Sequence, residues 1–255
     1  MHSLTIGGFD GVHIAHRELI KKADIVLVIE KGSSITPGFE RLFYINKKTD
    51  FLNLKEIKHL NPLEFINVLK KYNASKIIVG EDFRFGKNRS GDINLLKKHF
   101  EVETISEIKI DGVGVHSQII REFIKKGEIK KANKFLGRSY KIRGLHIKGQ
   151  GLGKKEFVPT INIELFKPFT IPKPAVYITK TNSLPSITFL GIRSTDNNFS
   201  IETHILNSEE IPNTKIIDIE FIKILRENMK FENLKRLKKQ ILKDIIMAKE
   251  FYGIN

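Results

Sequence analysis

Two histidines near the amino terminus have a spacing that suits the binding of a phosphate chain. His13 and His16 follow the run Gly7-Gly8-Phe9-Asp10-Gly11, and a stretch with helical character comes next. The free N–H groups and positive dipole of a helix N-terminus attract phosphates, and residues three apart lie on one face of a helix. Both imidazoles can then donate hydrogen bonds to one polyphosphate. Isolated surface histidines usually have no function, so the surrounding elements must support this interpretation.

A glycine-rich segment in the C-terminal half offers a second place for phosphates. Gly149, Gly151 and Gly153 precede the sequence Pro159-Thr160-Ile161-Asn162. Glycine lets the backbone approach a phosphate closely, and successive backbone N–H groups can form an anion-binding nest. The Gly-Lys-Ser/Thr end of a Walker A loop is missing, so this segment is not a P-loop. Taken alone, such a turn is more often a hairpin bend than a binding site.

Glu202 is a candidate general base. It lies in a run with the alternation of a β-strand, where Ile201, Thr203 and Ile205 fall on the opposite face. A carboxylate on the open face of a strand takes a proton from a substrate hydroxyl when that hydroxyl lies within hydrogen-bond distance. The strand pattern alone leaves a second interpretation open, a solvated glutamate without a catalytic role.

The N-terminal half reads as alternating strands and helices. We expect strands at 4–6, 24–30, 76–79 and 102–110, and helices at 16–22, 62–72, 93–100, 118–126 and 129–136. This alternation predicts a Rossmann-like domain in which helices cover both faces of a parallel sheet. A strand, a glycine turn and a helix at 4–22 would place the two histidines at the edge where such domains bind nucleotides.

Short strands dominate after Gly137. We expect them at 140–147, 160–164, 175–181, 186–192, 200–206 and 216–225, followed by an amphipathic helix at 232–251. This pattern predicts a small antiparallel six-stranded β-barrel closed by a C-terminal helix. We therefore expect an α/β domain at residues 1–136 and a β domain at residues 137–255.

Composition narrows the possible partners. The formal net charge is +15 and the pI is about 9.7, which favours anionic partners. The lysines are scattered along the chain, which argues against nucleic acid, and no apolar run approaches the roughly 20 residues of a membrane span. The absence of cysteine excludes disulfides and thiolate metal sites. Without a signal peptide, we expect a cytoplasmic protein that binds small molecules, with no nucleic acid, no membrane and no obligate protein partner.

The motifs together resemble one family. The run GGFDGVHIAH, Gly7 to His16, is similar to the His-x-Gly-His signature of nucleotidyltransferases and, more closely, to the start of the bacterial bifunctional riboflavin kinase/FAD synthetases. Further similar blocks follow in the same order along nearly the whole chain: 80–86 with 91–92, Ser117 with 120–121, 136–140, 159–162 and 201–206. The resemblance implies phosphorylation of riboflavin to FMN and adenylylation of FMN to FAD, both with ATP and Mg²⁺.

For the adenylyl transfer, the resemblance implies that His13 and His16 hold the phosphates of ATP and stabilise the departing pyrophosphate. Arg121 and Ser117 would act from the other side, and Asp82 would shape the nucleotide pocket. The other ATP-binding residues that it implies are Gly7, Phe9, Asp10 and Gly11. The implied FMN adenylyltransferase domain spans residues 1–136.

For the kinase, the resemblance implies that Glu202 is the base that takes the proton from the 5′-hydroxyl of riboflavin. Thr160 and Asn162 would serve both the magnesium ion and the ATP phosphates through their oxygen atoms, which are the ligands that Mg²⁺ prefers. The glycines at 149, 151 and 153 would lie against the phosphates. The implied riboflavin kinase domain spans residues 137–255.

Several departures from the family pattern leave alternatives open. Gly8 stands where the family commonly has asparagine, Ala15 replaces a glycine, and His116 and Gln118 stand where serine and threonine are usual. One alternative is therefore a riboflavin kinase with weak or absent FAD synthetase activity. A different nucleotidyltransferase sharing only the first motif would leave Glu202 and the 159–162 block unexplained. A nucleic-acid-binding module would require lysines and aromatic residues gathered on one face.

Overall fold

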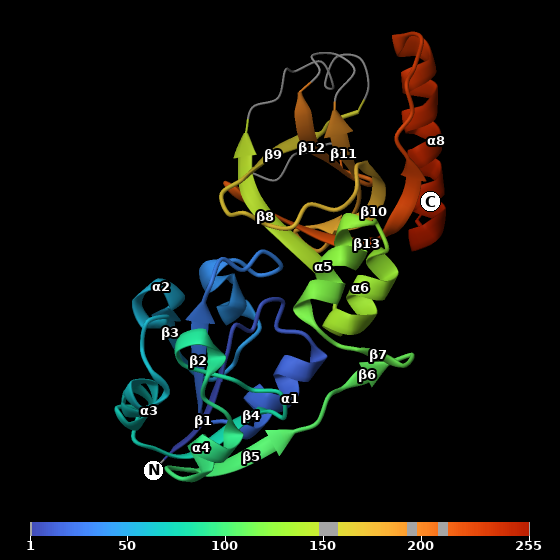
Figure 1. Cartoon of the computed structure of the whole chain (residues 1–255). Helices are drawn as coiled ribbons and strands as arrows, with labels where there is room; N and C mark the ends of the chain where they lie inside the picture. Colours follow the sequence, from blue (N-terminus) through green and yellow to red (C-terminus); the bar gives the residue numbers. More distant parts are fainter. Residues whose placement is uncertain (1, 148–157, 193–197, 209–213, 255) are drawn as a thin grey trace. The chain divides into compact units, whose positions relative to one another are not determined.

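A computed structural model describes residues 2–147, 158–192, 198–208 and 214–254 (Figure 1). The chain divides into two compact units, residues 1–119 and 120–255. The division falls inside helix α5 (Ser117–Lys125). The expected functional boundary after residue 136 stays a prediction.

The first unit contains a five-stranded parallel sheet with the strand order β3-β2-β1-β4-β5. Its strands are β1 (His2–Gly7), β2 (Ile25–Glu30), β3 (Lys48–Asn53), β4 (Ala74–Gly80) and β5 (Glu101–Ile105). The chain runs outward from β1 in both directions, so the strand order reverses between β1 and β4. In open α/β sheets, ligands bind beyond the carboxyl ends of the strands at such a point. The parallel sheet expected from the sequence is confirmed.

Helices cover both faces of this sheet, because successive strand residues point to opposite sides. On one face, Leu4, Ile6 and Leu27 pack with residues of α3 (Pro62–Lys70) and α4 (Ile93–Lys97). On the other face, Val26 and Val28 pack with residues from α1 (Ile14–Lys22) and the turn before it. Asn61 and Glu64 form a capping box that fixes the start of α3.

Some elements of this unit differ from the expectation. The strand β3 was not expected, since it lies at the edge of the sheet and its residues alternate between exposed and half-buried. The strand expected at 102–110 ends at Ile105, and a separate hairpin joins β6 (Lys109–Ile110) to β7 (Val113–Gly114). Positive φ angles at Asp111 and Gly112 make the tight turn between them. The remaining short elements are α2 (Leu54–Ile57), η1 (Gly38–Phe43) and η2 (Lys87–Arg89).

The second unit is built around a closed barrel with the strand order β10-β11-β12-β9-β8-β13. Its strands are β8 (Tyr140–Ile147), β9 (Ile161–Leu165), β10 (Ala175–Thr181), β11 (Leu184–Ile192), β12 (Phe199–Ile205) and β13 (Ile216–Glu227). All pairings are antiparallel, which confirms the expected six-stranded barrel. The helix α6 (Ile129–Leu136) is tied to the barrel by Asn133, whose side chain bonds the backbone of Tyr140 and Phe221.

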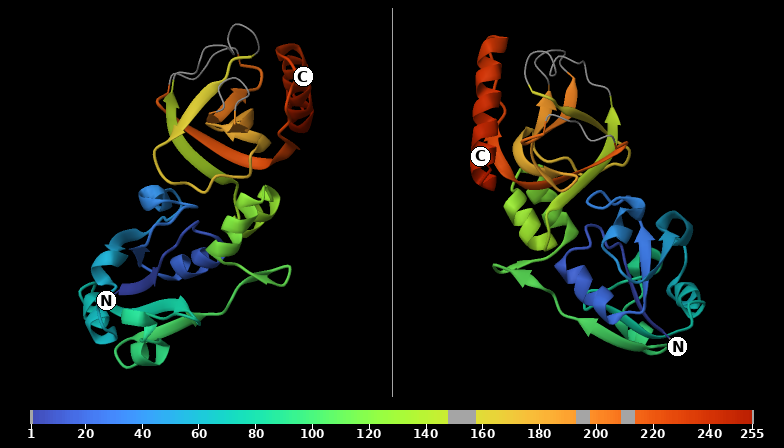
Figure 2. Two further views of the ribbon diagram at one scale, coloured as in Figure 1. Left: turned by 45° about the horizontal axis from the view of Figure 1, so that its top comes forward. Right: turned by 180° about the vertical axis from the view of Figure 1, so that it is seen from behind.

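Helix α8 (Leu234–Tyr252) lies along the outside of the barrel in every view (Figure 2). A buried ion pair holds it there: the guanidinium of Arg226 donates to both carboxylate oxygens of Asp244 at 2.6–3.0 Å. Asp244 is only 2% exposed, and Gln240 donates a further hydrogen bond to it at 2.8 Å. The carboxylate therefore exchanges its hydration for a full set of donors, as a buried charge requires.

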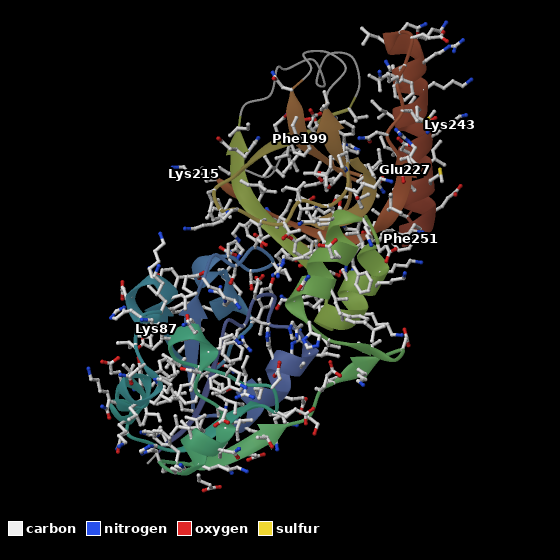
Figure 3. The ribbon with its side chains drawn as sticks, viewed as in Figure 1. Lys87, Phe199, Lys215, Glu227, Lys243 and Phe251 are labelled. Carbon is white, nitrogen blue, oxygen red and sulfur yellow. The ribbon has the colours of Figure 1, made fainter. Side chains whose placement is uncertain are left out.

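Charged side chains mostly project outward from both units, as Lys87 and Lys243 do (Figure 3). In the part of the chain that the structure describes, no helix is long and apolar enough to cross a membrane.

Candidate active sites

The first candidate site lies at the carboxyl edge of the parallel sheet. The strands β1 and β4 are neighbours, and they end at Gly7 and Gly80. The segments that follow, Gly8 to His13 and Glu81 with Asp82, therefore leave the sheet at the same edge, at the reversal of strand order. The side chain of Asp82 is exposed and folds back towards Gly80. A Cβ atom added to Gly80 would lie 3.0 Å from the Oδ1 atom of Asp82.

The two histidines stack at the start of α1. The centroids of the His13 and His16 rings are 3.5 Å apart, with 20° between the ring planes. Phe9 contacts His16 edge to face, with 5.2 Å between ring centroids. His13 is the N-cap of the helix, and its Nδ1 atom accepts a hydrogen bond from the backbone N–H of His16. A neutral His13 must then carry its proton on Nε2, which makes that atom a hydrogen-bond donor.

His16 lies in an environment that disfavours its charged form. Burial lowers its pKa well below the ordinary 6.5, and electrostatic interactions with His13, Arg41, Lys31 and His116 lower it further. Its Nδ1 atom is buried and has no hydrogen-bond partner among the described residues. The same cationic surroundings that disfavour a charged imidazole would favour an anion beside His16.

The turn before α1 has an unusual backbone. Phe9, Gly11 and Val12 have φ angles of 47°, 85° and 39°. A positive φ at a β-branched residue such as Val12 is strained and costs about 1–3 kcal/mol. Phe9 and Val12 are nevertheless almost fully buried, at 1% and 0% exposure, so core packing holds the turn in this shape. Such strain is concentrated at functional sites, where it pre-organises binding groups.

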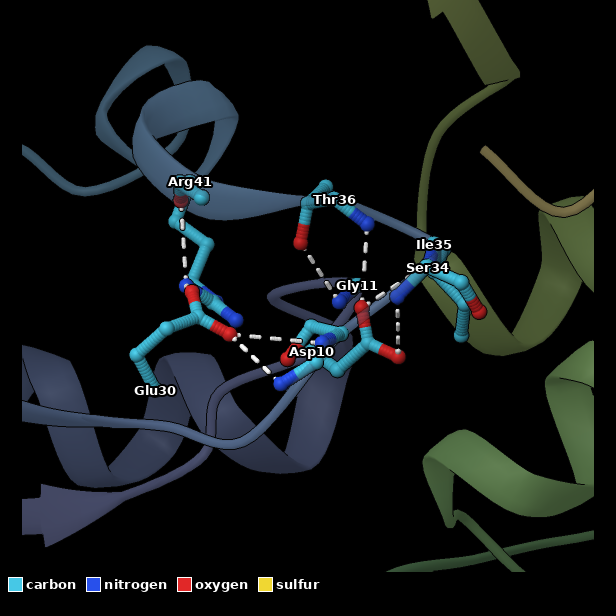
Figure 4. A network of polar contacts seen from close by, with 10 residues as sticks. Asp10, Gly11, Glu30, Ser34, Ile35, Thr36 and Arg41 are labelled. Carbon is cyan, nitrogen blue, oxygen red and sulfur yellow. Dashed lines mark hydrogen bonds and ion pairs between the residues drawn. The ribbon is translucent and has the colours of Figure 1, made fainter. Parts of the chain in front are cut away.

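Asp10 holds a neighbouring loop in place (Figure 4). Its carboxylate accepts hydrogen bonds from the backbone N–H groups of Ser34, Ile35 and Thr36 at 2.9–3.3 Å. Thr36 in turn accepts a hydrogen bond from the N–H of Gly11 at 2.7 Å through Oγ1. Asp10 is only 3% exposed, and a carboxylate repels phosphate. Asp10 therefore acts by holding the turn before α1 and the 34–36 loop against each other.

Ser117 joins the same network from the start of α5. Its hydroxyl donates a hydrogen bond to the backbone carbonyl of Asp10 at 2.8 Å. The structure thus brings Ser117 to the turn that carries the histidines. Arg121 is half-buried farther along α5, in the second compact unit.

Two cations near the first site were not among the expected site residues. Arg41 is fully buried and donates to Glu30 Oε2 at 2.6 Å and to the carbonyl of Gly38 at 3.0 Å (Figure 4). Its Nε and Nη2 atoms have no partner among the described residues. Lys31 follows directly on β2. The signal for Lys31 is a charged residue directly after a buried strand. Arg41 lies in η1, and no local pattern distinguishes it from an exposed arginine.

The second candidate site lies on the outer face of two paired barrel strands. Glu202 of β12 is directly opposite Asn162 of β9, and Thr203 is opposite Ile161. Thr203 and Ile161 are buried inside the barrel, whereas Glu202 and Asn162 are half-buried on the other face. Thr160 directly precedes β9, which begins at Ile161. The register therefore sets a carboxylate opposite an amide, and the hydroxyl of Thr160 follows from the chain just before the strand.

Two further residues on β12 support this face. Ser200 donates a hydrogen bond from its hydroxyl to Glu202 Oε1 at 2.9 Å. His204 donates from Nδ1 to the carbonyl oxygen of Pro159 at 2.8 Å, and so connects β12 to the residue before Thr160. Burial lowers the pKa of His204, which favours the neutral ring. Period-two spacing around Glu202 is the signal that would have found both residues.

The donor set of the second site fits a hard divalent cation, because it consists of oxygen atoms. Among the described residues, no three His, Asp or Glu side chains converge as an all-protein metal site. Gly149, Gly151 and Gly153 lie outside the described residues.

Comparison with known proteins identifies two families along the chain. Residues 44–122 match the FAD synthetase family, and residues 136–252 match the riboflavin kinase family. The bifunctional riboflavin kinase/FMN adenylyltransferase of Buchnera aphidicola subsp. Acyrthosiphon pisum is 30% identical over 294 aligned positions, which cover 99% of this chain and 94% of that protein. Proteins of the same name from Haemophilus influenzae and Escherichia coli K12 are 28% and 26% identical, each over 98% of this chain and 94% and 93% of their own length.

A solved structure from Streptococcus pneumoniae, described as a macrolide-efflux protein, has a TM-score of 0.86 and 21% sequence identity. The match covers 97% of this chain and 93% of that one. At this identity the likeness supports the fold alone. The sequence matches over almost the full length carry the assignment: the chain belongs to the family of bifunctional riboflavin kinase/FMN adenylyltransferases.

Proposed function

We propose that this chain makes FMN and FAD at two separate sites, one at the edge of the parallel sheet and one on the barrel. The observation that carries the proposal is the pairing of Glu202 with Asn162 on one face of the barrel, apart from the histidine pair at the sheet edge. Members of this family use ATP with a divalent metal ion. We infer that the metal is Mg²⁺ and that the substrates are riboflavin, FMN and ATP.

At the barrel site, Glu202 accepts the proton of the riboflavin 5′-hydroxyl as that oxygen attacks the γ-phosphorus of ATP. The bond between the γ-phosphorus and the bridging oxygen breaks, and ADP leaves. The hydroxyl of Ser200 keeps the carboxylate in one orientation. Thr160 and Asn162 would hold the Mg²⁺ ion, which supplies neutralisation of the triphosphate charge when bound.

At the sheet edge, a phosphate oxygen of FMN attacks the α-phosphorus of ATP, and pyrophosphate leaves. This reaction needs in-line positioning and charge neutralisation but no covalent nucleophile. His13 and His16 donate hydrogen bonds to the phosphates, and Arg121 adds a fixed positive charge. Ser117 and Asp10 hold the turn, the backbone of Gly7, Phe9 and Gly11 approaches the phosphates, and Asp82 borders the nucleotide.

We infer a cytoplasmic enzyme whose partners are small molecules, without nucleic acid, membrane or an obligate protein partner. Its net charge of +15 then attracts anionic nucleotides, while the lysines themselves are scattered along the chain.

Chromatography of the products formed from riboflavin and ATP tests the proposal. We expect FMN and FAD together with Mg²⁺ and neither product after chelation. Accumulation of FMN alone, with no FAD from supplied FMN, would favour the alternative of a riboflavin kinase that lacks FAD synthetase activity. Absence of both products would refute the proposed function.

A further inference from the structure

Lys31 lies at the same sheet edge as the histidine pair. It follows Glu30, the last residue of β2, and β2 is the direct neighbour of β1. Because the strands are parallel, Lys31 leaves the sheet beside the segment that follows Gly7. A Cβ atom added to Gly8 would lie 3.0 Å from Lys31 Cε and 3.6 Å from Lys31 Nζ. The end of the lysine therefore occupies the space above the backbone of Gly8.

The charge of Lys31 is not used to hold the fold. The adjacent carboxylate, Glu30, accepts hydrogen bonds from Arg41 and from the backbone of Gly32 and Ser33. Lys31 is exposed, and its ammonium forms no ion pair with another residue that the structure describes. Its positive charge nevertheless acts on His16, where it helps to lower the pKa of the imidazole. The ammonium is thus close to the histidines and available to a ligand.

We propose that Lys31 binds a phosphate group at the adenylyl-transfer site, in space that exists only because residue 8 is glycine. The inference rests on the proposed function of this site. An ammonium beside two imidazole donors suits a group with several anionic oxygens. A side chain at position 8 would push the flexible end of the lysine away. Gly8 and Lys31 therefore act together. The family that this chain resembles commonly has asparagine at the position of Gly8.

Two sources of phosphate meet at this site, the polyphosphate of ATP and the phosphate of FMN. Both present the same chemistry to an ammonium, and steady-state kinetics separates them. If Lys31 contacts ATP, its removal raises the KM for ATP and weakens inhibition by pyrophosphate. If Lys31 contacts FMN, its removal raises the KM for FMN alone.

The test compares the full-length Lys31→Met variant with Lys31→Arg and with Lys48→Met. Lys48 is exposed at the start of β3, at the opposite edge of the sheet. We expect Lys31→Met to raise one of the two KM values by about tenfold or more, as loss of a charge-assisted contact does. Lys31→Arg keeps the charge and restores most of the affinity, and Lys48→Met behaves as wild type. FMN formation from riboflavin stays unchanged in all three.

The Gly8→Ala variant tests whether Gly8 and Lys31 act together. Alanine fits by displacing only the mobile end of Lys31, so the fold is preserved. We expect Gly8→Ala to raise the same KM as Lys31→Met. In the double variant, Gly8→Ala should add almost nothing to the increase in KM that Lys31→Met causes. Additive effects would overturn the link between the two residues.

A measurement without ligand tests whether the charge of Lys31 acts on His16. In an NMR titration, Lys31→Met should raise the pKa of His16 towards its ordinary value, and Lys48→Met should leave it unchanged. If the wild type forms FAD but Lys31→Met keeps both KM values and the pyrophosphate inhibition, the phosphate contact is refuted and the proposed function survives. If the wild type forms no FAD from FMN, the function of the site fails first.

Discussion

The two candidate sites are built on different kinds of backbone. At the sheet edge, the candidate groups come from a strained turn, a helix start and loops, and the rings of the buried His13 and the half-buried His16 stack 3.5 Å apart near cationic side chains. On the barrel, Glu202 and Asn162 are fixed opposite each other by strand register. In the proposed function, the first arrangement would supply charge neutralisation for a transfer that needs no base, and the second would supply a base. Groups on a turn and a helix start can surround a charged ligand, whereas strand register fixes one carboxylate opposite one amide.

The largest expected effect concerns the base. Glu202→Gln keeps the shape of the side chain but cannot accept the proton, so FMN formation from riboflavin should fall by about 10²–10⁴-fold. FAD formation from supplied FMN should stay unchanged. Both rates are measured by chromatography, with Glu250→Gln on the exposed side of α8 as the matched control. Equal losses in both reactions would contradict the separation of the two sites.

The second prediction concerns stability, through the ion pair that holds α8 against the barrel. Asp244→Ala leaves the half-buried guanidinium of Arg226 without its carboxylate partner and should lower the free energy of unfolding by about 3 kcal/mol. Glu232→Gln removes the exposed ion pair between Glu232, just before the helix, and Arg236 of α8, and should change the free energy of unfolding by about 0–1 kcal/mol. Chemical denaturation measures both. Similar values for the two variants would mean that the buried pair does not fix α8.

The histidine pair should show the reverse pattern to Glu202. His16→Ala removes one phosphate donor and should lower FAD formation from FMN by about 10²-fold, as loss of a pre-organised transition-state donor does. FMN formation from riboflavin should be unaffected. The exposed His59 serves as control in the variant His59→Ala. A loss of FMN formation in His16→Ala would show that the histidine pair also serves the kinase reaction.

A smaller effect is expected from the link between His204 and Pro159. His204→Asn places an amide N–H near the position of Nδ1, whereas His204→Gln places it near Nε2. We expect His204→Gln to raise the KM for ATP in the kinase reaction by about tenfold, with little change in kcat, and His204→Asn to restore it. Equal behaviour of the two variants would argue against a positioning role.

The smallest effect is a dependence of stability on pH. The pKa of His16 lies below 6.5 in the folded unit, so the unfolded chain binds more protons between the two values. The free energy of unfolding should therefore fall as the pH drops below about 6.5 towards the folded pKa. His16→Gln should remove this component from denaturation curves recorded across that range. An unchanged pH profile would show that His16 titrates normally.

Both folds could be predicted from the amino-acid sequence. Alternating strands and helices predicted the parallel sheet, and short strands with turns predicted the barrel, because hydrophobic periodicity is local information. The edge strand β3 escaped notice, since half of its residues face solvent.

Only the tertiary structure decided which side chains meet. Glu202 and Asn162 are 40 positions apart, and strand register alone makes them neighbours. Lys31 above Gly8, Ser117 at the carbonyl of Asp10, and His204 at Pro159 are likewise contacts between segments distant in the chain. Local patterns give the face on which a residue lies, and packing of the whole unit decides what that face opposes.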